Sequence, residues 1–255
     1  MFKNTQAILF DIDGVLFVGN ELISGAVETI EYLRGKKMPM RFLTNTTTRS
    51  HNSLVEKIIG MGLPIKPEEI FAPPRLTAHY LKQLGDVKLH LILTDDTKAD
   101  FADFKIDEEN PDYIVFGHYD NRWNYDLLNK LFKQIMNGSK MVALHKGRYW
   151  QTEEGLTLDI GGFVVGLEHA TGEKAEVIGK PSSKFFEIAL DDIGVKAEQA
   201  IMVGDDIVND IYGAQNAGLK ALLVKTGKYR EEIIANSEIR PDIIINSVAD
   251  LMEII

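Results

Sequence analysis

The chain has 255 residues, with 28 basic and 38 acidic side chains, a formal net charge of −10 and a pI of about 5.1. This length suggests one large domain or two modest ones, with a substantial buried core. The acidic charge disfavours binding to nucleic acids and docking on an anionic membrane. The chain has no cysteine, which excludes disulfides and thiolate chemistry.

The N-terminal segment lacks the long apolar stretch and the small-residue cleavage site of a signal peptide. Residues 7–10 form an apolar run, but it is too short to span a bilayer and is followed by acids. A cytoplasmic location is therefore expected.

Eight short apolar runs have the character of strands, and helix-spaced apolar positions separate most of them. Continuous apolar runs are typical of strands that are covered on both faces, as in a parallel sheet. The alternation predicts an α/β fold with a doubly wound parallel sheet. The predicted strands cover residues 6–10, 40–43, 89–93, 113–116, 141–144, 200–203, 221–224 and 243–245, and the predicted helices cover residues 26–34, 53–61, 126–137 and 183–193.

The middle of the chain has strand and helix patterns of its own but no comparable cluster of acids after its strands. Its loops at residues 118–123 and 145–150 are charged and bear aromatic side chains. This stretch, residues 80–177, is predicted to be a second module inserted into the first. The ligand site is expected at the carboxyl ends of the strands of the doubly wound sheet.

The first predicted strand is followed by two acids, Asp11 and Asp13, and by Gly14. Alternate side chains of an extended segment point the same way, and a turn that begins at Gly14 can swing the second acid toward the first. Two carboxylates at a strand end, backed by another pair at a neighbouring strand, suit Mg²⁺. The alternative is a surface turn, because Asp-Gly is a common turn dipeptide.

Two further segments offer groups that can bind a phosphoryl group. Thr44 and Asn45 follow the second predicted strand, and a hydroxyl and an amide there can hydrogen-bond phosphoryl oxygens. Lys180 can neutralise charge on a phosphoryl group and on an attacking carboxylate. It does not belong to a nucleotide P-loop, because Pro181 follows it and the upstream glycine of that motif is missing. Taken singly, these residues are also common in loops, in helix caps and on surfaces.

The last acidic segment follows the predicted strand at residues 200–203. Gly204 permits a tight exit from this strand, so Asp205 is expected to face the same crevice as Asp11. Asp206 and Asp210 lie at the start of the next helix, where the helix dipole favours acids. For Asp206 we prefer this capping role.

These segments follow one another in a specific order: Asp11-Ile-Asp13-Gly, Thr44-Asn45, Gly-Lys180-Pro and Gly-Asp205-Asp-Ile-Val-Asn-Asp210. The order resembles the four motifs of the haloacid dehalogenase (HAD) superfamily. The insert between the second and third motifs resembles the α/β cap of subfamily IIA, which includes p-nitrophenyl phosphatases, pyridoxal phosphate phosphatase and phospholysine/phosphohistidine phosphatase. The likeness is greatest to its small, poorly characterised hydrolase-domain members. The resemblance implies a HAD-like Rossmannoid core at residues 1–79 and 178–255 and an inserted cap at residues 80–177.

The resemblance implies covalent catalysis at phosphorus. Asp11 would attack the phosphoryl group and form an aspartyl-phosphate. Asp13 would protonate the leaving oxygen and then deprotonate the water that opens the intermediate. An acid at position 13 favours phosphate ester chemistry, since related ATPases carry Thr there and phosphonate hydrolases carry Ala.

The resemblance also implies a ligand set. Mg²⁺ would be held by the Asp11 carboxylate, the Asp13 backbone carbonyl and Asp205. The phosphoryl oxygens would be bound by Thr44, the Asn45 backbone amide and Lys180. Asp210 would support Lys180 or the waters of the metal rather than coordinate it directly.

Substrate specificity is expected in the cap, because the core motifs handle only the phosphoryl group. Each cap residue has the alternative role of packing or of a solvated surface side chain. By the resemblance, the protein is also expected to form a homodimer through its cap. The candidate cap residues are His118, Tyr119, Asp120, Trp123, His145, Lys146, Gly161 and Gly162.

The leading functional hypothesis is hydrolysis of a small-molecule phosphate ester. One alternative is a phosphotransferase or mutase that passes the group from Asp11 to another hydroxyl. Another is a catalytically silent protein that binds a phosphorylated ligand. A nucleotide-binding dehydrogenase is disfavoured, because no Gly-x-Gly-x-x-Gly follows the first strand.

Overall fold

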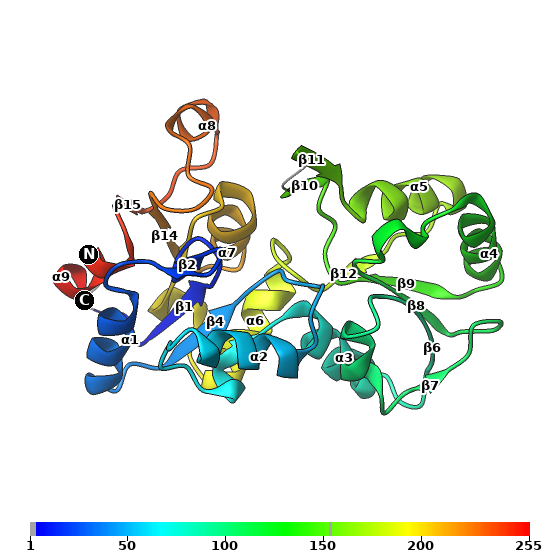
Figure 1. The fold of residues 1–255 in the computed structure, drawn as a ribbon, viewed down its shortest axis with the longest axis horizontal. Helices are drawn as coiled ribbons and strands as arrows, with labels where there is room; N and C mark the ends of the chain where they lie inside the picture. Colours follow the sequence, from blue (N-terminus) through cyan, green and yellow to red (C-terminus); the bar gives the residue numbers. More distant parts are fainter. Residues whose placement is uncertain (1–3, 153–154) are drawn as a thin grey trace. The chain divides into compact units, whose positions relative to one another are not determined.

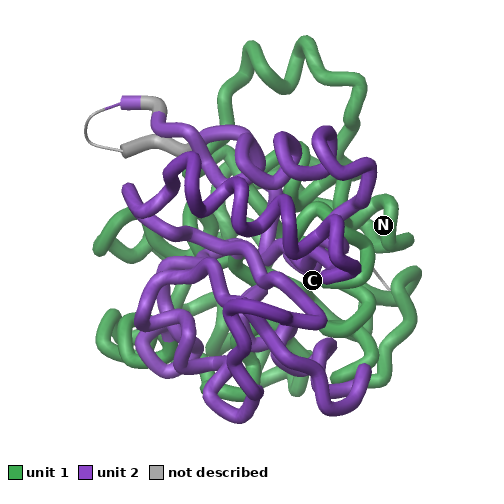
Figure 2. Tube along the Cα trace, turned by 90° about the vertical axis from the view of Figure 1, so that its right-hand side faces the viewer, with its two compact units in different colours: residues 1–44, 55–71, 180–255 green, residues 45–54, 72–179 purple. Residues whose placement is uncertain are grey.

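The structure of the protein is a computed structural model that describes residues 4–152 and 155–255 (Figure 1). The chain divides into two compact units (Figure 2). Unit 1 comprises residues 1–44, 55–71 and 180–255, and unit 2 comprises residues 45–54 and 72–179. Residues 45–54, 72–79 and 178–179 thus group with unit 2, whereas we predicted them within the core. The assignment of a catalytic core and a cap stays a prediction.

Unit 1 is built on a parallel sheet with the strand order β15-β14-β13-β1-β4-β5. The chain adds β4 and β5 on one side of β1 and later adds β13 to β15 on the other side, so the strand order reverses beside β1. Doubly wound sheets bind ligands at this reversal, outside the carboxyl ends of the strands. The strands are β1 (Ala7–Asp11), β4 (Met40–Leu43), β5 (Ile70–Phe71), β13 (Ala200–Gly204), β14 (Lys220–Val224) and β15 (Ile243–Ile245).

Strand β1 lies inside this sheet, and all five of its residues are buried. It pairs in parallel with β13, where Phe10 lies opposite Val203, and with β4, where Asp11 lies opposite Leu43. Side chains on both faces of the strand are buried, which explains why its sequence is apolar up to the final acid. A short hairpin of β2 (Phe17–Val18) and β3 (Glu21–Leu22) follows it.

Helices α1 (Ala26–Gly35) and α6 (Ser183–Ile193) of unit 1 each bury one apolar face. In α6, Phe185, Phe186, Ala189 and Leu190 recur at helical spacing and are all buried. This helix and the predicted strands at residues 40–43 and 243–245 form over the expected residues. The other helices are α2 (His51–Gly60, which spans the boundary at residue 54), α7 (Gly213–Asn216), α8 (Glu231–Asn236) and α9 (Leu251–Ile254).

Unit 2 has a parallel sheet of its own, with the order β12-β9-β8-β6-β7. The predicted strands at residues 89–93, 113–116 and 141–144 form within one residue of their expected positions. A hairpin of β10 (Tyr149–Thr152) and β11 (Gly155–Leu158) is also present. The sheet strands are β6 (Lys88–Ile92), β7 (Lys105–Ile106), β8 (Tyr113–Phe116), β9 (Lys140–Ala143) and β12 (Glu176–Val177).

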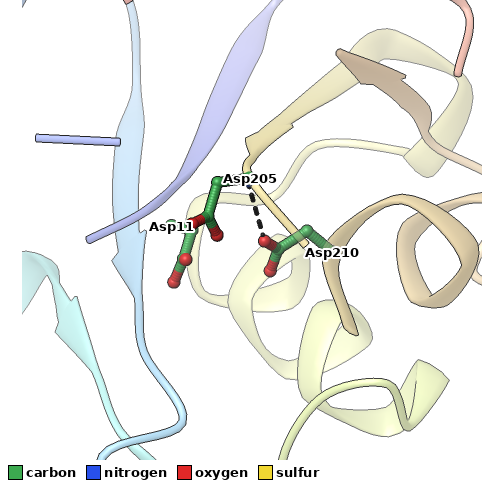
Figure 3. Close-up of side chains that lie close together, drawn as sticks. All are labelled: Asp11, Asp205 and Asp210. Carbon is green, nitrogen blue, oxygen red and sulfur yellow. Dashed lines mark hydrogen bonds between the residues drawn. The ribbon is translucent and has the colours of Figure 1, made fainter. Parts of the chain in front are cut away.

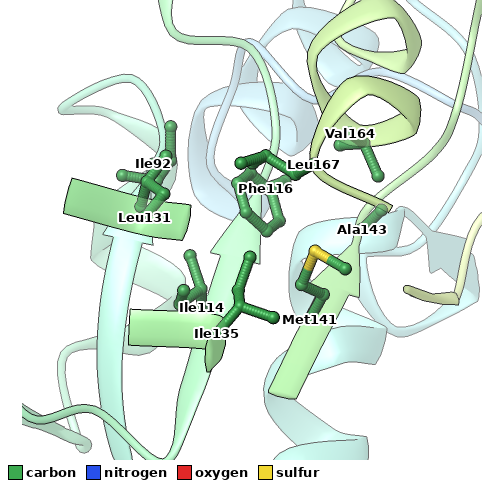
Figure 4. Close-up of a cluster of buried hydrophobic side chains, with 9 residues drawn as sticks. All are labelled: Ile92, Ile114, Phe116, Leu131, Ile135, Met141, Ala143, Val164 and Leu167. Atoms are coloured by element: carbon green, nitrogen blue, oxygen red, sulfur yellow. The ribbon is translucent and has the colours of Figure 1, made fainter. Parts of the chain in front are cut away.

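The core of unit 2 lies between this sheet and the helices α4 (Tyr125–Met136) and α5 (Gly161–Thr171) (Figure 4). Burial of these apolar side chains is the main force that holds the layers together. A third helix, α3 (Pro73–Gln83), begins with two prolines, a residue type that suits the first helical turn. The core side chains in Figure 4 are Ile92, Ile114, Phe116, Leu131, Ile135, Met141, Ala143, Val164 and Leu167.

Throughout residues 4–152 and 155–255, each helix is too short or too polar to cross a membrane.

Candidate active site

Three carboxylates of unit 1 meet at the reversal of its strand order (Figure 3). Asp11 ends β1, Asp205 directly follows β13, and Asp210 lies in the helical segment Ile207–Tyr212. Because β1 and β13 are parallel neighbours, their carboxyl ends lie side by side. One oxygen from each of the three acids lies within 4.8 Å of the others, and all three residues are buried. The expected meeting of Asp11 and Asp205 therefore occurs.

Lys180 supplies the positive charge inside this cluster. Its Nζ donates hydrogen bonds of 2.6 Å to Asp11 Oδ1 and of 2.6 Å to Asp210 Oδ1. The lysine is only 2% exposed, and burial alone would lower its pKa. The two adjacent carboxylates outweigh burial and raise the pKa of Lys180, which favours the charged form of the side chain.

Asp210 uses both of its oxygens. While Oδ1 accepts from Lys180, Oδ2 accepts the backbone N–H groups of Asp205 at 3.1 Å and of Asp206 at 3.0 Å. Burial, together with the negative charge of Asp11, raises the pKa of Asp210 to about 6. A side chain at Gly204 would lie 2.2 Å from Asp210 Cβ, so only glycine lets this acid fold back onto the strand end.

Asp205 is held on one side only. Its Oδ2 accepts the backbone N–H of Lys228 at 2.7 Å, whereas its buried Oδ1 has no hydrogen-bond partner. Burial, with the charges of Asp11 and Asp210, raises the pKa of Asp205 to about 8. A buried acceptor without a hydrogen-bond partner costs folding free energy, so a ligand bound at Oδ1 would offset this cost.

This donor set fits a hard divalent cation. Mg²⁺ prefers carboxylate and carbonyl oxygens, and it is usually bound by one or two carboxylates. Asp205 belongs to the same buried cluster as Asp11, and its Oδ1 has no hydrogen-bond partner, while Asp210 has both oxygens occupied. Asp11 and Asp205 are therefore the carboxylates suited to the metal, and the geometry suits Asp210 for the expected supporting role.

Asp13 differs from the three buried acids in that it is exposed. Its Oδ2 accepts a hydrogen bond of 3.3 Å from the buried Thr44 hydroxyl. The turn after Asp13 forms at Gly14, whose φ of +87° strongly favours glycine. The structure thus joins Asp13 to Thr44, across the ends of the paired strands β1 and β4.

Asn45 follows Thr44 directly but groups with unit 2. A side chain added at Gly179 would lie 2.9 Å from Asn45 Oδ1, so the amide lies beside the residue that precedes Lys180. Its role toward a phosphoryl group stays a prediction.

Asp206 has the capping role that we preferred for it. Its Oδ1 accepts the backbone N–H groups of Val208 and Asn209, at 3.0 and 2.9 Å. Its Oδ2 also forms an ion pair of 3.0 Å with Lys228 Nζ. We did not single out Lys228 from the sequence, although its position in the loop after β14, the strand beside β13, was a usable signal.

The candidate cap residues have partners within unit 2. His118 Nε2 lies 3.0 Å from Asp120 Oδ1, and Trp123 stacks on Phe163 at 4.2 Å between ring centroids. Tyr119 packs edge-on against Trp123. Each contact is compatible with a packing role, and contact of these residues with substrate stays a prediction.

The other cap candidates surround His145. The buried imidazole accepts the Gly147 N–H at Nδ1, and its Nε2 lies 3.3 Å from Thr47 Oγ1. Lys146 pairs with Glu168 at 3.1 Å. A side chain at Gly161 would lie 2.3 Å from the Gly147 carbonyl oxygen, so the close approach that this glycine permits is within unit 2.

Comparison with known proteins places the chain in a family. Residues 8–107 match the model of the haloacid dehalogenase-like hydrolases, and residues 177–251 match a HAD-hydrolase-like model. A phospholysine phosphohistidine inorganic pyrophosphate phosphatase of Rattus norvegicus is 38% identical over 99% of this chain and 95% of its own length. Haloacid dehalogenase-like hydrolase domain-containing protein 2 of Homo sapiens is 38% identical over 88% of this chain and 86% of its own.

Solved structures give the same result. A 4-nitrophenylphosphatase from Thermotoga maritima superposes with a TM-score of 0.90 at 29% identity, over 98% of this chain and 97% of that one. A p-nitrophenyl phosphatase from Archaeoglobus fulgidus superposes with a TM-score of 0.91 at 26% identity, over 98% and 99% of the two chains. The chain belongs to the haloacid dehalogenase-like hydrolases and, within that family, to the phosphatases.

Proposed function

We propose that the protein is a Mg²⁺-dependent phosphatase that hydrolyses a small-molecule phosphomonoester through an aspartyl-phosphate on Asp11. The observation that carries the proposal is the buried cation of Lys180, 2.6 Å from Asp11, beside the unpaired oxygen of Asp205. Lys180 orients the Asp11 carboxylate, and Asp205 is the second acid that would hold a metal together with Asp11. This combination supports attack by a carboxylate on an anionic phosphoryl group.

Asp11 and Asp205 would hold Mg²⁺, with the backbone carbonyl of Asp13 as a further ligand. When bound, the ion offsets the repulsion between the attacking carboxylate and the phosphoryl group and stabilises the charge of the transition state. Thr44, the Asn45 amide and Lys180 are proposed to bind the phosphoryl oxygens.

In the first step, an oxygen of Asp11 forms a bond to phosphorus while the bond from phosphorus to the leaving oxygen breaks. Asp13 donates its proton to that oxygen, so the alcohol leaves neutral. In the second step, water attacks phosphorus, Asp13 takes a proton from the water, and the bond to Asp11 breaks. Inorganic phosphate leaves, and both acids return to their starting states.

Two contacts support these roles. The hydroxyl of Thr44, which follows β4, donates a hydrogen bond to Asp13 Oδ2 and so orients the proposed acid. Lys180 contacts both Asp11 and Asp210, and their carboxylates raise its pKa against the effect of burial, which favours the charged lysine before the reaction.

The names of the relatives suggest the first substrates to test. They refer to phospholysine, phosphohistidine, inorganic pyrophosphate and nitrophenyl phosphate. These compounds differ in the atom that leaves phosphorus and in charge, so a panel of them separates P–N, anhydride and ester substrates. Sugar phosphates, nucleotides and phosphorylated cofactors complete the panel.

The test is a phosphate-release assay with this panel, comparing wild type with Asp11→Asn. Asparagine is nearly isosteric with aspartate but is a poor nucleophile, so we expect release to fall by at least about 10³-fold. Removal of Mg²⁺ with EDTA should abolish wild-type release, and added Mg²⁺ should restore it. Phosphate released per substrate consumed separates hydrolysis from transfer to another hydroxyl. Equal release by wild type and variant would overturn the proposal.

A further inference from the structure

The loop after β14 brings a basic residue against the acid cluster of unit 1. Lys228 exposes its side chain, but its backbone N–H donates to Asp205 Oδ2 at 2.7 Å. Its ammonium group forms an ion pair of 3.0 Å with Asp206 Oδ2. One residue thus contacts both of the acids that follow β13, through two different groups.

The loop fits closely against Asp205. Side chains added at Gly14 or at Gly227 would each lie 2.0 Å from Asp205 Oδ2, and Gly227 has a φ of +60°. The Thr226 hydroxyl donates to the Gly14 carbonyl oxygen at 2.5 Å. The two glycines and this hydrogen bond hold the backbone of Lys228 at the distance that its N–H bond to Asp205 requires.

The contact determines which oxygen of Asp205 is available. With Oδ2 occupied by the Lys228 N–H, the buried Oδ1 is the oxygen of Asp205 that has no hydrogen-bond partner, in a cluster that also contains Asp11. Without this donor, the Asp205 carboxylate could rotate about its Cβ–Cγ bond and present either oxygen to the metal. Hydrogen bonds to a metal ligand from outside the coordination sphere fix its orientation in this way.

The Lys228 ammonium group pairs with Asp206, an acid that is itself held by other hydrogen bonds. Asp206 accepts two backbone N–H groups through Oδ1 and the Asn209 side-chain amide through Oδ2, so its carboxylate has little freedom. An ion pair to such an anchor restrains the lysine and with it the backbone N–H. The side chain therefore acts on Asp205 through the loop and not by direct contact.

We infer that Lys228 is a positioning residue for the metal site, because its ammonium group, held by Asp206, keeps its N–H on Asp205 and so presents Oδ1 of that acid to the cation. This inference rests on the proposed Mg²⁺ dependence. It concerns the orientation of the Asp205 carboxylate toward the metal, and it adds no step to the reaction at phosphorus.

The sign of the effect separates positioning from charge alone. A cation beside a metal site repels the metal, so a purely electrostatic role predicts that Mg²⁺ binds more tightly when the lysine is removed. A positioning role predicts weaker binding, because Asp205 loses its fixed orientation. A role in stability alone predicts a lower melting temperature with unchanged metal affinity.

The experiment is a titration of the purified protein without substrate, with Mg²⁺ followed by calorimetry and Mn²⁺ by electron paramagnetic resonance. We expect Lys228→Met to bind both ions roughly 10-fold more weakly, and Lys228→Arg to stay within about 2-fold of wild type. Lys225→Met, at an exposed lysine of the same loop, is the matched control and should bind as wild type does.

A proline at position 228 provides the second arm, because it removes the N–H donor itself. Lys228→Pro should bind the metal more weakly than Lys228→Met; if proline prevents folding, the methionine and arginine variants decide. Unchanged or tighter binding by Lys228→Met would overturn the inference. Failure of the wild type to bind Mg²⁺ would instead overturn the proposed function, so the two failures are distinct.

Discussion

The same spacing of three acids follows one strand in each unit, although we expected no comparable acids in the middle of the chain, and the two sets differ in burial. After β13, unit 1 has Asp205, Asp206 and, four residues later, Asp210. After β6, unit 2 has Asp95, Asp96 and, again four residues later, Asp100, so the three acids have the same spacing in both units. The first set contributes two acids to a buried cluster, whereas Asp95 and Asp96 of the second set are exposed.

The residue before each set accounts for part of the difference. Gly204 leaves room for Asp210 to fold back, since a side chain there would lie 2.2 Å from Asp210 Cβ. Thr94 stands in the corresponding place of unit 2, and its hydroxyl lies 2.8 Å from Thr97 Oγ1. Asp100, the last acid of this set, accepts the backbone N–H of His51 at the start of α2 with both of its oxygens.

The neighbouring strands account for the rest. Beside β13, strand β1 ends in Asp11, and Lys180 lies between the acids. Beside β6, strand β8 ends in the buried Phe116, which offers no charge to a cluster. The spacing of acids after a strand therefore does not make a site. A second charged strand end and a buried cation are needed as well.

The largest expected effect on stability is that of removing the buried cation. Lys180→Met leaves Asp11 and Asp210 buried together without a counter-charge, which should cost about 3–5 kcal/mol of unfolding free energy at neutral pH. Phosphate release should also fall by roughly 10²-fold or more, because a donor to the phosphoryl group is lost. Urea unfolding without Mg²⁺ and the phosphate-release assay measure the two effects.

The matched control is Lys146→Met in unit 2. Lys146 also pairs with a buried acid, but Glu168 keeps the Ala175 N–H and a longer contact to Lys174. This partly exposed pair should contribute only about 1 kcal/mol. A comparable loss of stability in the two variants would contradict the distinction between the two units.

The next effect compares the two acids at the end of the shared pattern. Asp210→Asn leaves either Lys180 or the N–H groups of Asp205 and Asp206 facing an amide donor, so about 1–3 kcal/mol of stability should be lost. Phosphate release should drop roughly 10- to 100-fold, as for other residues that support a metal ligand. Asp100→Asn keeps an acceptor for His51 and should cost less than about 1 kcal/mol.

Thermal melts and phosphate release on the same two variants check this order. If Asp100→Asn lowered release as far as Asp210→Asn, the acidic pattern of unit 2 would have to be assigned a catalytic role.

Much of the site follows from the positions of strand ends. Asp11 and Asp205 end or follow apolar runs, so a parallel sheet places them together, as predicted. The capping role of Asp206 follows from its place before a helix. The loop after β14 indicates that Lys228 lies near the site, but its contact with Asp205 could not be predicted, because the donor is a backbone N–H, which every residue except proline carries.

The missed helices have a similar explanation. Helix α3 begins at two prolines and α5 at two glycines, and both residue types disfavour a helix in its interior. Proline is tolerated in the first turn, where its N–H would lack a partner in any case. Helix α5 is stabilised by Val164 and Leu167, which pack into the core of unit 2. Tertiary packing of this kind is not visible in local propensity.

The smallest expected effect is a pH dependence that belongs to unit 2. His90 on β6 is buried, and its Nδ1 lies 2.9 Å from Gln134 Oε1. Burial lowers the pKa of His90 more than the bond to Gln134 raises it. The unfolded chain therefore binds the proton more readily, with a pKa of about 6.5. Stability is complete above that pH and is lost as the pH falls below it, by at most about 1.4 kcal/mol per pH unit.

Urea unfolding at pH 7.5 and 5.5 tests this, followed by tryptophan fluorescence, since both tryptophans, Trp123 and Trp150, belong to unit 2. Burial also lowers the pKa of His145, and it lowers the pKa of His51 to about 4, so three histidines of unit 2 make wild type lose stability in this pH range. His90→Asn should remove only its own share, and the exposed His79→Asn should remove none. A wild-type loss that survives unchanged in His90→Asn would mean that His90 is not the group that must become charged, and that His51 and His145 couple unit 2 to acid pH.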